Sequence, residues 1–354
     1  MTLDDMEATS IRIATVALGQ VLALLIAVTA ATSTALAHRL GQTFPTVQSG
    51  LVYLTIIAIY GTYHGVSSLF HRNENENGID NEDEKHLNEP PPPTEKWWKY
   101  AGLALLDVEA NYFTVSAFRI TSVTSVTLLD SWSIPMVLAF TTLFGLATYR
   151  RGHYTGAALC IFGLIMLVVT DQRQSKGGDQ LQQNPILGDA LVILGTTLYA
   201  ACNVLQEHLL QGIQVSKVLF MLGVFGALIS LVQGIVLGEV GMLFTMPWSL
   251  GTVGLWIGFS VAMVCFYSLV PFELLWGGAA ILNLSLLSSD VWSALARLVF
   301  FGGFSVWSGG WFVVSFVFVA LGITIYSKTG QAKRPVAEVG LPYYRSVETG
   351  MDES

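Results

Sequence analysis

The chain has 354 residues, of which 53% are hydrophobic and only 12% are charged. Soluble globular proteins carry about 25% charged residues, so this composition indicates a membrane protein. A membrane span needs about 20 apolar residues, and ten spans with short loops would occupy most of the chain. That length excludes a large additional soluble domain. The lack of a basic cluster argues against nucleic acid as a partner. The net charge of −8 comes mostly from one acidic segment, residues 72–97.

Ten apolar stretches predict membrane-spanning helices, and hence an all-α integral membrane protein within the lipid bilayer. We place them at 11–38, 46–70, 98–118, 122–147, 152–170, 187–211, 217–238, 250–271, 276–298 and 309–327. Ala35-Leu36-Ala37 resembles a signal-peptide cleavage site, but the apolar run from Ile13 to Ala31 exceeds the usual core of about 7–15 residues. We therefore interpret the first stretch as a retained span.

The polar segments divide the chain into three membrane parts, 11–71, 98–170 and 187–327, which hold spans 1–2, 3–5 and 6–10. Between and around them lie an N-terminus (1–10), a linker (72–97), a loop (171–186) and a tail (328–354). The linker carries eight acids and the Pro90–Pro93 run, which predicts a disordered segment. An acidic binding segment is the alternative reading. The tail is also expected to be disordered.

The distribution of lysine and arginine predicts the orientation. If the N-terminus is cytosolic, twelve of the 17 Lys and Arg residues fall in cytosolic segments. The positive-inside rule then favours both termini in the cytosol.

Ten spans can be divided into two halves of five with opposite orientation, as in many secondary transporters. One short repeated motif supports this division. Asp-x-Trp occurs at Asp130 in the fourth span and again at Asp290 in the ninth. Thr127 and Asn283 precede these aspartates on the same helical face.

Carboxylates and amides inside the predicted spans are the candidate functional groups, because an acid in hydrocarbon is costly unless it meets a cavity or a partner. The third span concentrates Asp107, Glu109, Asn111 and Tyr112 within six residues. Two readings stay open: hydrogen bonds that hold helices together, or direct handling of a cargo or a proton.

Three polar residues of the sixth span, Tyr199, Asn203 and Glu207, follow one another at four-residue spacing on one stripe. Glu207 is expected near the end of the span, where it can be solvated, whereas Glu109 is expected to lie deeper. The predicted substrate-site residues are Gln20, Asp107, Glu109, Asn111, Tyr112, Thr127, Asp130, Tyr199, Asn203, Glu207, Asn283 and Asp290.

The polar set also indicates the kind of cargo. A multiply anionic cargo calls for Lys or Arg at its site, but no lysine lies mid-span and the arginines lie near span ends. Acids, amides and aromatic rings suit a flat, neutral or cationic small molecule. The chain carries no P-loop, metal-ligand cluster or nucleophile motif, so we expect no enzyme activity, metal or cofactor.

Several of these strings resemble a known family. Asp-Val-Glu-Ala-Asn-Tyr at 107–112, Ala-Leu-Gly-Gln-Val-Leu at 17–22 and Thr-Ser-Val-Thr-Leu-Leu-Asp at 124–130 are similar to subfamily F of solute carrier family 35, in the branch of members F1 and F2, within the drug/metabolite transporter superfamily. The resemblance implies ten helices in two inverted five-helix repeats (the drug/metabolite transporter fold), alternating access, and a Golgi, other endomembrane or plasma-membrane location. It also implies queuosine or its base queuine, a nucleobase-like solute, as cargo.

The ninth span departs from the family pattern, since it reads Gly-Gly-Ala-Ala-Ile-Leu-Asn at 277–283 where relatives have Thr and Ser. Two alternatives therefore stay open. The first is a Golgi exchanger of nucleotide sugars or phosphate esters that uses Arg119 and Arg297. The second is a non-transporting membrane scaffold that uses the linker and the tail. The sequence does not indicate an oligomeric state.

Overall fold

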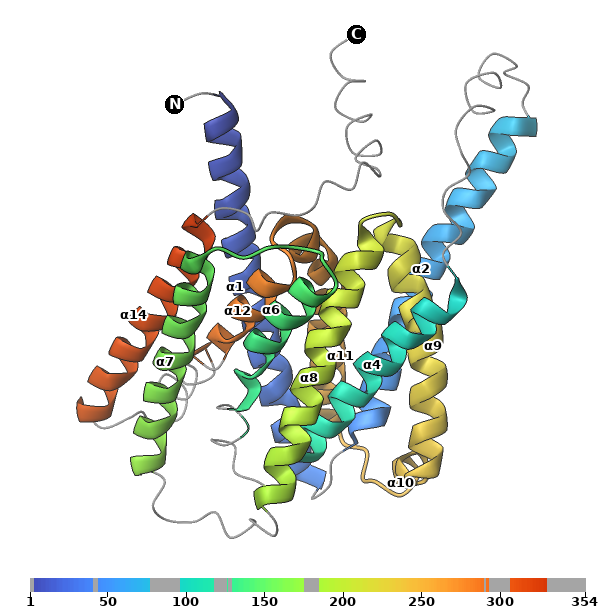
Figure 1. Ribbon diagram of the computed structural model, residues 1–354. Helices are drawn as coiled ribbons and strands as arrows, with labels where there is room; N and C mark the ends of the chain where they lie inside the picture. The colour runs from blue at the N-terminus through green and yellow to red at the C-terminus, as the bar shows by residue number, and fades with distance from the viewer. Residues whose placement is uncertain are drawn as a thin grey trace.

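The computed structural model describes residues 3–40, 44–76, 96–117, 126, 129–174, 185–289, 291–292 and 306–329, and these contain helices and no β-strand. The helices are α1 (Leu3–Leu40), α2 (Pro45–Glu76), α4 (Trp97–Ala117), α6 (Ser133–Leu143), α7 (Arg151–Gln174), α8 (Pro185–Leu210), α9 (Val215–Val236), α10 (Glu239–Leu243), α11 (Leu250–Trp276), α12 (Ala279–Leu286) and α14 (Val306–Lys328). Figure 1 shows the long helices side by side. By length and composition, four described segments could cross a membrane: Ile13–Ser33, Ile186–Leu210, Val215–Val236 and Leu250–Trp276.

Several helices extend beyond the apolar runs that predicted them. Helix α1 begins at Leu3, and α2 continues to Glu76, so the first residues of the segment predicted to be a disordered linker are helical. Helix α11 continues through Pro271 to Trp276, five residues past the predicted end of its span. A helix does not have to stop where its apolar run stops, because its backbone hydrogen bonds are local and can persist into polar sequence.

Neighbouring helices pack antiparallel with small residues at their contacts. In the α7–α14 pair, Phe162 lies against Phe318 with ring centroids 5.1 Å apart, and Gly156 faces Gly322 and Tyr326. A methyl group placed on Gly156 would come within 2.7 Å of the Gly322 carbonyl oxygen. This glycine therefore allows the two backbones to approach closely, as small residues do between helices in lipid.

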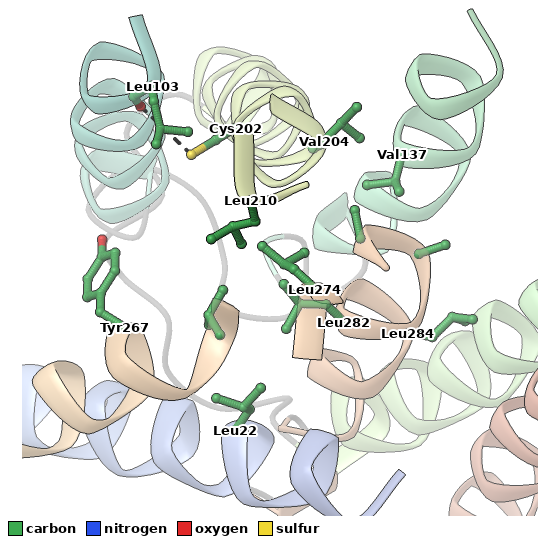
Figure 2. Packing of buried hydrophobic residues seen from close by; sticks show 14 of the residues in the cluster. Leu22, Leu103, Val137, Cys202, Val204, Leu210, Tyr267, Leu274, Leu282 and Leu284 are labelled. Carbon is green, nitrogen blue, oxygen red and sulfur yellow. Dashed lines mark hydrogen bonds between the residues drawn. The ribbon is translucent and has the colours of Figure 1, made fainter. Parts of the chain in front are cut away.

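The buried core lies between the helices and not on their outer faces. Figure 2 shows it where α1, α4, α8, α11 and α12 meet. The buried leucines labelled there are Leu22, Leu103, Leu210, Leu274, Leu282 and Leu284. By contrast Leu228, Leu231 and Val232 of α9 are each more than half exposed. An apolar outer face suits a helix that contacts lipid.

We predict that Gly156→Ala destabilises the α7–α14 pair by about 1–3 kcal/mol, because the added methyl group overpacks against backbone atoms that cannot move independently. The matched control is Gly254→Ala in α11, where an added methyl group meets no atom within 4 Å. Thermal unfolding of the purified variants in detergent should show a lower midpoint for Gly156→Ala alone. An equal loss in both variants would contradict the packing argument.

Candidate functional site

Four helices bring their polar side chains together around Asp107 of α4. Its Oδ2 accepts hydrogen bonds from the hydroxyls of Tyr53 on α2 (2.6 Å) and Tyr267 on α11 (2.5 Å). The thiol of Cys202 on α8 lies 3.8 Å from Oδ1. All four side chains are buried. We call this set the Asp107 cluster; it ties α2, α4, α8 and α11 to one carboxyl group.

The geometry of the Asp107 cluster combines an acid with two aromatic faces. The rings of Tyr53 and Tyr267 lie 5.9 Å apart at 54°. Figure 2 shows Tyr267 on α11 and, across from it, Cys202, whose sulfur also lies 3.8 Å from the Leu103 carbonyl oxygen. A carboxylate can accept about four hydrogen bonds. Asp107 therefore keeps acceptor capacity beyond its two tyrosine partners.

The other predicted residues of the third span take separate positions. Asn111 is buried, and its amide donates to the backbone oxygen of Asp107 (2.9 Å). Tyr112 is half-buried with its ring against Phe113. Glu109 is half-buried and faces α9, where the Gln233 amide lies 3.2 and 3.4 Å from its two oxygens.

The polar residues predicted in the sixth span, Tyr199, Asn203 and Glu207, lie on α8. Tyr199 is half-buried on α8, and Asp130 is half-buried just before the start of α6. The Asn203 amide lies 3.4 Å from Asn283 Oδ1 on α12, and Asn283 in turn donates to the Ala279 backbone oxygen (2.7 Å). The structure thus brings Asn203 of α8 next to a polar group of α12.

Glu207 is not solvated, although its place near the end of the predicted span would have allowed it to be. Its side chain is only 4% exposed, and its Oε2 accepts the backbone N–H of Ala279 (2.8 Å) at the start of α12. The preceding Gly278 has a φ of 82°, a conformation that favours glycine. Glu207 lies near the end of α8, as expected, but it is more buried than Glu109, because the beginning of α12 covers the end of α8.

Gln20 links α1 to the segment that follows α12. Its side-chain oxygen accepts hydrogen bonds from Ser288 Oγ (3.0 Å) and Trp292 Nε1 (3.2 Å). These hydrogen bonds join one part of the protein to another, as packing contacts do. Thr127 and Asp290, the remaining predicted site residues, lie outside the described part of the chain, as do Arg119 and Arg297.

Sequence reasoning missed two kinds of residue. Tyr53 and Tyr267 contact Asp107 from helices distant in sequence, and no local pattern marks them. Glu273 was overlooked because the span was predicted to end at Pro271, yet the apolar Leu274 and Leu275 that follow it were an available signal. Glu273 is fully buried. Among the described side chains, no cluster of His, Cys, Asp or Glu could hold a metal ion.

Comparisons with known proteins identify the family. The sequence model that describes solute carrier family 35, subfamily F, matches residues 9–328 of this chain. Solute carrier family 35 member F2 of Mus musculus is 31% identical over 94% of this chain and 83% of its own length. The Xenopus tropicalis protein of the same name is 32% identical over 89% of this chain and 76% of its own length.

A likeness to a solved structure supports the fold. A chain in one crystal structure superposes with a TM-score of 0.60 at 18% identity, over 90% of this chain and 99% of that chain. At this identity the likeness concerns the fold alone. Solute carriers are membrane transporters and not enzymes, which agrees with the apolar helices and the buried polar groups described above. The chain therefore belongs to solute carrier family 35, subfamily F, and is an integral membrane transporter of that family.

Proposed function

We propose that this transporter carries a flat, nucleobase-like solute that is neutral or cationic, and that queuosine or queuine is the cargo. The observation that carries the proposal is the Asp107 cluster, an acid flanked by two tyrosine rings. The rings offer faces for a planar heterocycle, and the carboxyl group offers an acceptor for its N–H groups or for a protonated amine.

The charges of the described residues favour this cargo over an anionic one. Among the side chains whose burial the structure describes, no lysine or arginine is buried, whereas Asp107, Glu207, Glu239 and Glu273 are. A nucleotide sugar or phosphate ester would bring several negative charges to buried acids without a compensating cation, which is unfavourable.

The packing pairs support a two-repeat arrangement of the helices. We compare the helices by matching α1, α2, α4, α6 and α7 in order with α8, α9, α11, α12 and α14. With this correspondence, the most extensive contacts between the two halves come in matched pairs. Thus α1 packs on α11 as α8 packs on α4, and α1 packs on α12 as α8 packs on α6.

The corresponding helices α2 and α9 pack against each other, and so do α7 and α14, in both cases antiparallel. We infer from this inversion a ten-helix carrier with two inverted repeats and alternating access. We further propose, from the lysine and arginine distribution, that both termini are cytosolic, in a Golgi, other endomembrane or plasma membrane.

Uptake of labelled queuine by cells that lack their own carrier tests the cargo. Cells expressing the chain should accumulate label above an empty-vector control. Asp107→Asn should lower the initial rate about tenfold or more, since a hydrogen bond to a charged group contributes about 1.5–3 kcal/mol. The same change at Asp189, outside the Asp107 cluster, should leave the rate near that of the parent. Absence of uptake with the protein present in the membrane would refute queuine as cargo.

The tyrosines of the Asp107 cluster should also contribute to stability. Tyr267→Phe keeps the ring but removes one donor to Asp107, so we expect a loss of about 1–3 kcal/mol. Tyr63→Phe is the matched control, because Tyr63 is 60% exposed on α2. Thermal unfolding in detergent, compared between the two variants, measures the difference. Equal midpoints would show that the Tyr267 hydrogen bond does not stabilise the packed helices.

A further inference from the structure

Glu273 is a buried acid that lies outside the Asp107 cluster. It lies in the last turn of α11 and has no exposed surface, and neither carboxyl oxygen has a hydrogen-bond partner among the residues that the structure describes. It lies where α11 meets α1 and α12. A methyl group placed on Gly19 of α1 would lie 3.2 Å from Glu273 Oε1 and would collide with Ser285 Oγ of α12. Ser285 Oγ is likewise buried without a partner.

Among the side chains that the structure describes, the titratable groups on the helices packed against α11 do not neutralise Glu273. Glu207 of α8 accepts a hydrogen bond from the Ala279 N–H, and Tyr53 of α2 donates one to Asp107. Arg39 of α1 lies against Gly251, at the opposite end of α11.

Lys217, the one titratable residue of α9, lies in the first turn of that helix and is partly exposed. Helix α12 contains no titratable side chain. Since both oxygens of Glu273 lack a hydrogen bond, none of these groups compensates a negative charge there.

An ionised carboxyl group without donors or a counter-ion is strongly disfavoured in such a place, whereas a neutral carboxylic acid is tolerated. We propose that Glu273 is a proton-binding site, that it holds a proton when α1, α11 and α12 pack as seen here, and that it couples transport to protons. The coupling, though not the proton binding, rests on the proposed transport function.

The position of Glu273 indicates how a proton would be exchanged. Separation of α1 and α12 from the end of α11 would admit water, and the carboxylic acid would release its proton to water and become a hydrated carboxylate. The helices could not repack on that charge until the carboxylate had taken up a proton again. Pro271 lies two residues before Glu273 and supplies no backbone N–H, so the last turn of α11 is less firmly held to the rest of the helix.

Infrared difference spectroscopy of the purified protein at neutral pH tests the proton binding directly. Comparison of the parent with Glu273→Gln should show loss of the carbonyl-stretch band of one protonated carboxylic acid. Glu239→Gln is the matched control. Glu239 is 6% exposed, but it accepts the backbone N–H groups of Thr46 (3.0 Å) and Val47 (3.2 Å), which favour the ionised form. That variant should lose carboxylate bands only.

Loss of carboxylate bands alone in Glu273→Gln would overturn the proposal. If Glu273→Gln does not fold, Glu273→Asp keeps the carboxyl group in altered surroundings, and the carboxylic-acid band should shift. An unshifted band would assign it to another residue and would equally overturn the proposal.

Queuine uptake into liposomes tests the coupling. A pH difference across the membrane should change the uptake rate of the parent, and this dependence should be lost in Glu273→Gln. A pH dependence that persists in that variant would overturn the coupling by Glu273. If the parent moves no queuine, the proposed cargo fails, while the infrared result still decides whether Glu273 binds a proton.

Discussion

Hydrocarbon cannot solvate a polar side chain, so an acid buried among the helices needs a partner within the protein unless it is held in its neutral form. Glu207 and Glu239 meet this constraint with backbone N–H groups at the starts of α12 and α2. Asp107 meets it with two tyrosine hydroxyls. Each solution joins helices that are far apart in the chain. The buried acids thus determine how the helices are held to one another.

Helix α11 connects the two acids of greatest functional interest. Tyr267 on this helix donates to Asp107, and Glu273 lies less than two turns later, beyond Pro271. The helix packs against α1, α2, α8, α9 and α12. A movement of its final turn would change the surroundings of Glu273, while Tyr267 is held on the other side of the proline. Helix α11 thus connects the proposed proton-binding site at Glu273 to the proposed cargo site around Asp107.

The sequence predicted the acids of the third span as important because of the cost of placing them in lipid, and the structure finds Asp107 at the meeting point of four helices. It did not predict the partners of Asp107, since Tyr53 and Tyr267 come from helices that only the tertiary fold brings together. The burial of Glu207 was missed for the same reason: it depends on where α12 begins. Glu273 escaped notice because a proline followed by an acid resembles the end of a helix.

Apolar runs of sufficient length made the helical, membrane-embedded character of this chain predictable, because a polypeptide in lipid has to satisfy its backbone hydrogen bonds within each segment. The pattern could not show which faces pair. Lipid tails are as apolar as a packed leucine, so the inner and outer faces of a helix carry similar residues and hydrophobic periodicity is weak. The choice of neighbours, and with it the grouping of Tyr53, Asp107 and Tyr267 and the isolation of Glu273, came from close packing at small residues and from hydrogen bonds between helices.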